Sequence, residues 1–287
     1  MSEKLKDLLL KTLAPRSNKC PVEWIGENAR QPDGSRYSWN WAHVMKEVVH
    51  SVNDVPETTL VTIPQFAKTS TAMAMMQYFA WADPAQPIMA VTTNDKKIKE
   101  MRDLQIINRL EHMPDFKPYI PPPHRLNKNV LNILMSPLVL ASGQSTGDAK
   151  STPVKYLFGD ECDEWRKYKG SAKNVKTAFS KQSSNVTEEN IFDLFSRRTN
   201  SYSKKGARKF WYSTPSVKSN YISKSYELGD QSEYYLKCPC CNDFILPEIS
   251  DFEWEGKLIT GEYDDDILRE SASIKCIKCE GFITKKN

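Results

Sequence analysis

The chain has 287 residues and is nearly balanced in charge: 40 lysine and arginine residues stand against 36 acidic residues, for a formal net charge of +4. Hydrophobic residues make up 39% and charged residues 26%, which allows a sizeable core and excludes a disordered tail. The length favours one large domain and a smaller one. The start, Met1 to Lys11, lacks a signal-peptide pattern, and no apolar stretch approaches the roughly 20 residues that span a bilayer. We therefore expect a soluble intracellular protein with reduced thiols and no contact with a membrane.

Strands and helices are predicted to alternate along most of the chain. In chain order the pattern predicts a helix over Lys4–Leu13, a helix over Trp39–Val52, a strand over Thr58–Ile63, a helix over Thr69–Trp81, a strand over Pro87–Thr92, a helix over Asn94–Met113 with Asn94 as its cap, strands over Val130–Met135 and Leu138–Ala141, a strand within Val154–Glu161, a helix within Glu188–Phe195 and a strand over Arg208–Ser213. This alternation is typical of an α/β fold with a mainly parallel sheet covered on both faces. After about Gly229 the texture changes to short strands and cysteine pairs, which indicates a domain boundary.

The segment Pro64–Ser70 has the order of a phosphate loop: strand, tight loop, Lys68-Thr69, helix. In such a loop backbone N–H groups and the helix N-terminus bind phosphate oxygens, the lysine reaches the β and γ phosphates, and the threonine hydroxyl meets Mg²⁺. The usual glycines are missing, and Ala67 precedes the lysine. Taken alone, the segment somewhat favours the alternative, a helix start capped by Thr69 with Lys68 in solvent.

Two adjacent carboxylates, Asp160 and Glu161, follow the apolar run that begins at Val154. A carboxylate pair at the tip of a parallel strand is what an ATPase uses to hold Mg²⁺ and to activate a water molecule. The alternative is a strand followed by an acidic, solvated loop. The order of a Lys-Thr loop and then an acidic strand tip favours the nucleotide site, with Asp160 on Mg²⁺ and Glu161 on the attacking water.

Four of the seven cysteines form two Cys-x-x-Cys pairs, Cys238 with Cys241 and Cys276 with Cys279. In a reducing compartment this pattern indicates a structural zinc site with four thiolate ligands. Cys240 could replace Cys241 as a ligand, although the spacing favours Cys241. Reduced thiols or an adventitious disulfide are the alternative.

Further motifs complete an ordered set. The loop Pro64–Thr69 is similar to Ala-Gln-x-Gly-Lys-Thr at Gln65, Lys68 and Thr69, with Ala67 in place of glycine. Asp160-Glu161-Cys162-Asp163 fits the pattern Asp-Glu-x-Asp. The other motifs are the small-residue segment Ala141–Ser145, the pair Arg198-Thr199, the strand end Tyr212-Ser213-Thr214-Pro215, and the aromatic and cysteine segment Tyr234–Cys241. From about Arg36 onward the chain resembles the large terminase subunit of tailed phages, in the lambda-type (GpA-like) branch. These proteins are ATP-driven motors that package viral DNA into a prohead.

The resemblance implies a P-loop NTPase fold: an N-terminal helical segment over 1–57 that leads into the motor, an ATPase core over 58–229, and a zinc-ribbon-like β module over 230–287. It implies an ATPase that translocates double-stranded DNA, with ATP, Mg²⁺ and a structural Zn²⁺. The implied partners are DNA, the prohead portal, a small terminase subunit and identical subunits in a ring, in the host cytoplasm.

The resemblance also assigns residues. Gln65 and Ala67 would join Lys68 and Thr69 around the phosphates. Ser213 and Thr214 would bind the nucleotide by sensing the γ phosphate through their hydroxyls and would couple hydrolysis to motion; the alternative is a strand that simply ends in a turn. Arg198 is the candidate for the positive charge that a ring motor supplies at a neighbour's transferred phosphate, with a helix C-terminal cap as the alternative. Adenine contacts are expected from the segment Arg36–Trp41, and the basic run that begins at Lys204 is a candidate for DNA contact.

The family continues into a nuclease domain, for which this sequence leaves no room after Cys279, so we expect no DNA cleavage by this chain. Its late acidic cluster, Asp264-Asp265-Asp266, is expected to be a solvated loop. The sequence does not distinguish a fragment from a split motor. Two other functions stay open: a helicase-like nucleic-acid ATPase, and an inactive nucleotide-binding scaffold that carries a zinc-ribbon binding module.

Overall fold

The computed structural model describes residues 19–122, 129–165, 190–217, 220–255 and 264–284. The chain divides into two compact units, Met1–Gly229 and Asp230–Asn287. Within the described ranges no helix is long and apolar enough to cross a membrane. The helix predicted over Lys4–Leu13 lies outside the described residues.

Unit 1 is built on a six-stranded sheet in the order β1-β6-β5-β2-β4-β3. All neighbouring strands are parallel except the β3–β4 pair. The strands are β1 (Glu57–Val61), β2 (Ile88–Thr92), β3 (Val130–Ile133), β4 (Ser136–Ser142), β5 (Tyr156–Asp160) and β6 (Arg208–Ser213). This mainly parallel sheet confirms the predicted α/β class.

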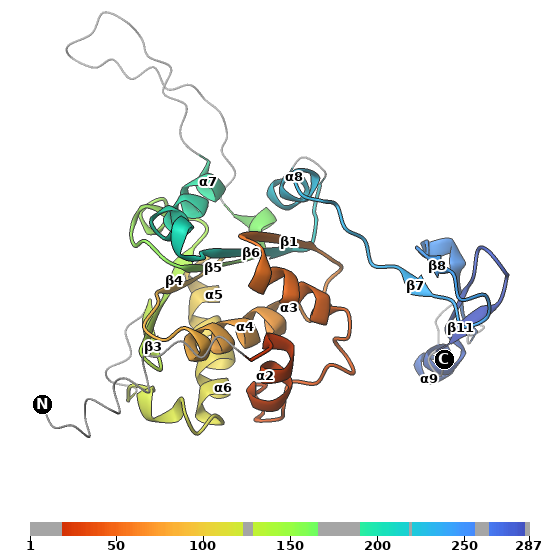
Figure 1. Cartoon of the computed structure of the whole chain (residues 1–287), viewed down its shortest axis with the longest axis horizontal. Coiled ribbons are helices and arrows are strands. Elements are labelled where there is room, and N and C mark those ends of the chain that lie inside the picture. Colours follow the sequence, from red (N-terminus) through yellow and green to blue (C-terminus); the bar gives the residue numbers. More distant parts are fainter. Residues whose placement is uncertain (1–18, 123–128, 166–189, 218–219, 256–263, 285–287) are drawn as a thin grey trace, which may run out of the picture. The chain divides into compact units, whose positions relative to one another are not determined.

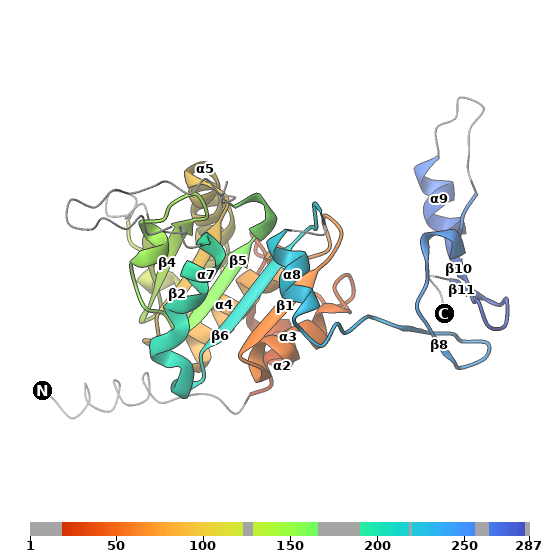
Figure 2. The ribbon, with the colours of Figure 1, turned by 90° about the horizontal axis from the view of Figure 1, so that it is seen from above.

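Helices cover both faces of this sheet, as Figures 1 and 2 show for α2 to α6 on one face and α7 and α8 on the other. They are α2 (Pro21–Asn28), α3 (Met45–Asp54), α4 (Lys68–Ala82), α5 (Asp95–Glu100), α6 (Asn108–Glu111), α7 (Ile191–Ser196) and α8 (Tyr221–Glu227). Alternate residues of β5 reach the two layers: Tyr156 and Phe158 belong to the core beneath α2 to α6, and Leu157 to the core beneath α7 and α8. Because both faces are buried, Ile88–Val91 of β2 and Tyr156–Gly159 of β5 form runs without a charged side chain.

Two helices differ from their predicted ranges. The helix expected from Trp39 begins only at Met45, because the Trp39 indole donates to the carbonyl of Val22 at 3.1 Å and is held against α2. The helix expected over Asn94–Met113 is capped by Asn94 as predicted, but its middle, Met101–Ile107, is π-helical. Met101 and Ile106, five residues apart, are both buried, which the wider π turn permits.

The described residues of unit 2 include two small antiparallel sheets and an α-helix. They are β7 (Leu236–Lys237) with β8 (Phe244–Ile245), then β9 (Phe252–Glu253), β10 (Ser273–Lys275) and β11 (Phe282–Thr284), and α9 (Asp265–Ser271). The acidic cluster predicted as a loop instead begins a helix, because the Asp264 carboxylate accepts hydrogen bonds from the N–H groups of Asp266 and Ile267.

Candidate active site

The sheet order brings the predicted motifs to one edge of unit 1. Strand β6 lies between β1 and β5, and the three strands run parallel. Their carboxyl ends therefore meet at the same edge of the sheet: the loop before Lys68, the Asp160-Glu161 pair, and Ser213-Thr214. Ligand sites of open parallel sheets lie at such an edge.

The loop between β1 and α4 takes the shape of a phosphate loop without glycine. Gln65 and Ala67 both lie in the left-handed region, with φ of 58° and 57°. Ala67 precedes α4 and makes no side-chain cap, so the first N–H groups of this 15-residue helix are open to an anion. An open pocket of about 350 Å³ lies here, lined by Trp41, Pro64, Gln65, Phe66, Ala67, Lys68, Thr69, Ser70 and Glu161.

Ala67 is strained where glycine would not be. A left-handed conformation costs an L-residue about 1–2 kcal/mol, part of which the greater freedom of glycine in the unfolded chain offsets. Ala67→Gly should therefore raise the free energy of unfolding of unit 1 by up to about 1 kcal/mol and keep nucleotide binding. Urea titration measures it. Ala72→Gly, in the buried interior of α4, is the control and should lower stability by about 1 kcal/mol; the same sign for both variants would contradict the strain.

Lys68 joins the three strand ends. It is only 5% exposed, and its Nζ donates to the Ile63 carbonyl at 3.1 Å and to Thr214 Oγ1 at 3.0 Å. Its Nζ also lies 3.8 Å from Glu161 Oε1. The sequence left open the alternative that Lys68 lies in solvent. That alternative is wrong, because the ammonium group is buried beside the pocket.

Asp160 lies between two threonine hydroxyls. Thr69 Oγ1 donates to its Oδ1 at 3.3 Å, and Thr92 Oγ1 donates to its Oδ2 at 3.5 Å. Burial, and then the neighbouring charge of Glu161, raise the pKa of Asp160 to about 7. Hydroxyl and carboxylate oxygens are the ligands that Mg²⁺ prefers, and a cation here would remove the cost of the buried negative charge. Thr92 was not predicted as a site residue, because a threonine at a strand end is unremarkable in sequence.

Glu161 is held in an unusual conformation by the end of β6. Its φ is 47°, in the left-handed region. Its Oε2 accepts hydrogen bonds from Ser213 Oγ and from the Thr214 N–H, each at 3.2 Å, and Oε1 faces Lys68. Ser213 and Thr214 thus contact the acid that lines the pocket, which gives the Ser-Thr-Pro strand end a direct partner.

Asp163, the last acid of Asp-Glu-x-Asp, ties this edge to α8. It is 3% exposed. Its Oδ2 accepts from the Ser216 N–H at 3.0 Å and from Ser216 Oγ at 3.1 Å, and its Oδ1 accepts from the Ile222 N–H at 2.9 Å. Sequence patterns show an acid at this position but not the backbone groups that it binds.

Arg198 is not among the residues around the pocket. Its Nε donates to the Leu194 carbonyl at 3.3 Å and its guanidinium donates to the Lys150 carbonyl at 3.2 Å. Its own carbonyl accepts from Val154, which precedes β5, so Arg198 lies toward the amino ends of the strands. A role for it at the site of a neighbouring subunit stays a prediction.

In unit 2 the four predicted cysteines come together. The Sγ atoms of Cys238, Cys241, Cys276 and Cys279 all lie within 4.8 Å of one another. The Sγ atoms of Cys238 and Cys279 are 3.7 Å apart, and those of Cys241 and Cys276 are 3.9 Å apart. Thiolates on tetrahedral zinc stand roughly 3.8 Å apart for a Zn–S distance of about 2.3 Å, so the set fits zinc and is too open for disulfides. Cys240 is exposed and lies outside the group.

Comparison with known proteins identifies the family of this chain. The model of the ATPase domain of the phage terminase large subunit gpA matches residues 35–287. Two solved structures of the large terminase ATPase domain of Thermus phage P74-26, one a mutant, are 11% and 10% identical, with TM-scores of 0.46 and 0.45 over 74% of this chain and 78% of theirs. At these values the likeness is too distant to assign residues. No significant match was found among curated proteins. Because the family model covers nearly the whole chain, the protein belongs to the gpA family of phage terminase large subunits and carries its ATPase domain.

Proposed function

We propose that this chain couples ATP hydrolysis to the movement of double-stranded DNA into a prohead. Family membership gives an ATPase of DNA packaging. The observation that carries the proposal is the contact of Lys68 with both Thr214 and Glu161, since it links the phosphate loop to the acid and to the strand end beside it. An inactive scaffold would not require a buried lysine beside a glutamate whose backbone is held in the left-handed conformation.

Each group at the pocket has a role in this proposal. Lys68 binds the β and γ phosphates, with N–H groups from the loop of Gln65 and Ala67. Thr69 and Asp160 would hold Mg²⁺, whose positive charge would offset the negative charge of the phosphates. Glu161 orients and deprotonates the attacking water. Trp41, an exposed indole in the pocket lining, offers a surface for the adenine ring.

Ser213 and Thr214 give hydrolysis a route to movement. Both bind the Glu161 carboxylate, so a change at Glu161 alters the end of β6 directly. Asp163 then connects the same turn to the start of α8. We propose that this path carries motion to the DNA and that Arg198 serves the site of the next subunit in a ring.

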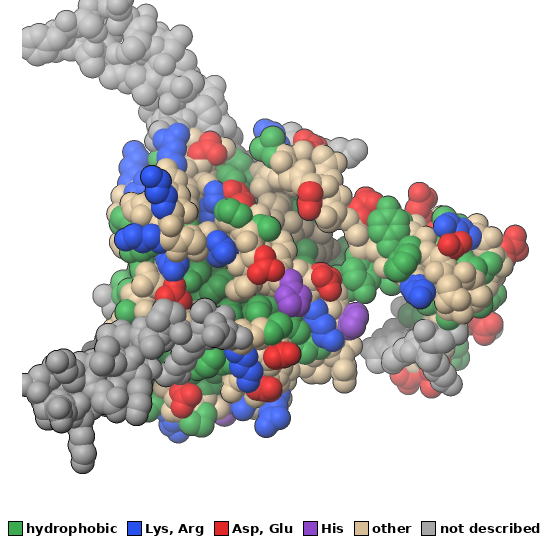
Figure 3. Space-filling model, in the orientation of Figure 1, with side chains coloured by type: hydrophobic (Ala, Val, Ile, Leu, Met, Phe, Trp, Pro, Cys, Tyr) green, Lys and Arg blue, Asp and Glu red, His purple; other side chains and the backbone are tan. Residues whose placement is uncertain are grey.

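DNA contact is proposed for the exposed part of the basic run. Figure 3 shows lysine and arginine side chains gathered around α7 and the segment that follows it. Arg208 donates to the Asn53 carbonyl and Lys209 pairs with Glu57, whereas Lys204 and Lys205 are exposed. Lys204 and Lys205 are therefore our candidates for phosphate contacts, and DNA binding that weakens with salt less steeply in their alanine variants would support them.

The proposal also includes a structural metal and the partners of the motor. The four cysteines hold a structural Zn²⁺, and the portal, a small terminase subunit and identical subunits are partners in the host cytoplasm. Among the described residues the cysteine set is the only group of three or more potential metal-binding side chains within reach of one ion. As part of the proposal, the chain hydrolyses ATP and does not itself cleave DNA.

The decisive test is DNA-stimulated ATP hydrolysis by Lys68→Ala. Without the ammonium group the polyphosphate loses its main counter-charge, and the phosphate loop loses its hydrogen bond to Thr214. The rate of hydrolysis should therefore fall at least about 100-fold. Phosphate release with and without double-stranded DNA measures it. Lys97→Ala, at an exposed lysine paired with Glu100, is the control and should keep full activity. The absence of hydrolysis in the wild type would favour the inactive scaffold, and DNA unwinding in place of translocation would favour the helicase.

A further inference from the structure

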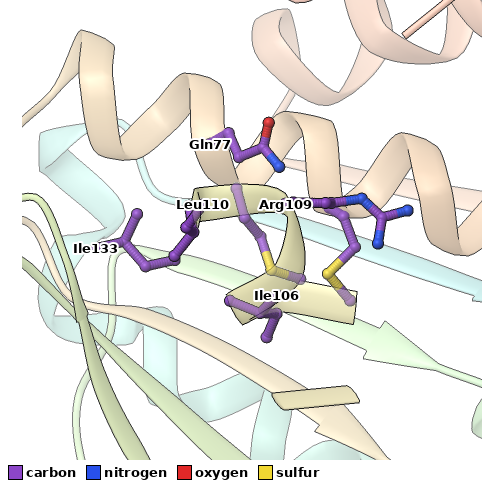
Figure 4. A pocket seen from close by; sticks show the side chains of 7 residues that line it. Gln77, Ile106, Arg109, Leu110 and Ile133 are labelled. Carbon is purple, nitrogen blue, oxygen red and sulfur yellow. The ribbon is translucent and has the colours of Figure 1, made fainter. Parts of the chain in front are cut away.

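Arg109, a residue of α6, is a buried cation outside the predicted motifs. It is 2% exposed. Figure 4 shows it with Gln77, Ile106, Leu110 and Ile133 around a cavity of about 10 Å³, no larger than one water molecule. Its guanidinium extends away from the apolar side chains of that cavity, so its charge is directed elsewhere.

Within the part of the chain that the structure describes, the guanidinium donates only to neutral acceptors. These are the carbonyl and Oε1 of Gln105, at 2.9 Å and 2.6 Å, Gln31 Oε1 at 3.2 Å and Ser70 Oγ at 3.3 Å. No carboxylate of the described residues lies within ion-pair distance of it. Burial lowers the pKa of Arg109 to about 10, so the group is charged at neutral pH. The carboxylate of Asp33, beyond ion-pair distance, offsets only part of the effect of burial on this pKa. A buried charge without an ion-pair partner is costly, which suggests that a further counter-charge comes with a ligand.

The direction of this charge points to that ligand. Ser70, which Arg109 contacts, belongs to the first turn of α4 and lines the pocket of the phosphate loop. The N-terminus of α4 already favours an anion there. Arg109 therefore lies directly behind the wall of the pocket, one side chain away from it.

We propose that Arg109 is a positioning residue of the nucleotide site: it fixes Ser70 and supplies, from behind the phosphate loop, a permanent positive charge that favours polyphosphate over less charged ligands. The inference rests on the proposed function, because it needs a nucleotide in that pocket. Its effect on affinity should grow with each phosphate of the ligand. It should change nucleotide binding and not kcat, since Arg109 does not touch the reacting atoms.

The experiment compares ATP, ADP and AMP binding to the whole chain by calorimetry. A charge acting over roughly 8–10 Å at an effective dielectric constant of about 20–40 changes affinity about 4- to 30-fold. Arg109→Gln should weaken the binding of ATP by about that factor, the binding of ADP less and the binding of AMP least. Its kcat at saturating ATP should stay within about twofold of the wild-type value. Arg109→Lys, which keeps the charge, should retain the wild-type ratio of ATP to AMP affinity. Ser70→Ala separates the hydrogen bond from the charge and should change that ratio little.

The matched control is Arg208→Gln, which removes an arginine at the amino end of β6 and should leave all three affinities unchanged. Equal losses for ATP, ADP and AMP in Arg109→Gln would show a packing role and overturn the proposal, as would unchanged affinities. If that variant does not fold, a lowered ATP-to-AMP ratio in Arg109→Lys overturns it and a retained ratio supports it. Failure of the wild type to bind ATP would instead sink the proposed function.

Discussion

Replacing Glu161 by glutamine is expected to leave ATP bound and to slow its hydrolysis about 10²- to 10⁴-fold, the usual contribution of a positioned general base. Glutamine has the size of glutamate, and its carbonyl oxygen can still accept from the Thr214 N–H that binds Glu161 now. It cannot take a proton from water. The loss therefore falls on kcat, while binding through Lys68 and the loop is kept.

Single-turnover phosphate release and calorimetric binding of a non-hydrolysable ATP analogue measure the two effects separately. Glu164→Gln is the matched control, since Glu164 is an exposed carboxylate in the same turn and lies outside the pocket lining. It should hydrolyse ATP at the wild-type rate. Normal turnover in Glu161→Gln, or equal losses in both variants, would remove Glu161 from the role of base.

The sequence predicts well what is local to the chain. Lys68-Thr69 after a β-branched strand, and Asp160-Glu161 after an apolar one, are short patterns whose spacing alone places side chains at strand ends. The parallel sheet then follows from the alternation of strands and helices, and it brings these ends together. The cysteine pairs are local in the same sense, because each Cys-x-x-Cys turn presents two thiols on one side.

Contacts between distant segments were beyond the sequence. Nothing in the pattern shows that Thr92 donates to Asp160, or that Asp163 binds the N–H of Ile222, 59 residues further on. Arg109 follows a π-helical stretch within a segment that the sequence pattern predicts as one regular helix, so the pattern does not show which face buries it. The left-handed Ala67 likewise replaces a glycine that a motif search would require. Such features arise from tertiary packing, which overrides local preference.

The metal in unit 2 should decide whether that unit folds. Its buried cluster consists of Cys238, Ile245 and Cys276, with only a few half-buried neighbours. So small a core cannot offset the entropy of ordering the chain, and domains of this kind need a metal or disulfides. Zinc bound by four thiolates contributes about 10–16 kcal/mol in small zinc-binding peptides, far more than this cluster can supply.

We therefore expect Cys276→Ser to lose its zinc and unfold unit 2 while unit 1 keeps its own thermal transition. Elemental analysis gives the metal content, and limited proteolysis should cut the described part of unit 2 in the variant but not in the wild type. Cys240→Ser is the control: Cys240 is exposed and outside the ligand group, so it should keep one zinc per chain and resist the protease. Removal of zinc by a chelator should reproduce the variant, and its return should restore the fold. A Cys276→Ser chain that still held one zinc with unit 2 intact would show that the metal has other ligands, since three thiolates and a hydroxyl bind it far less tightly.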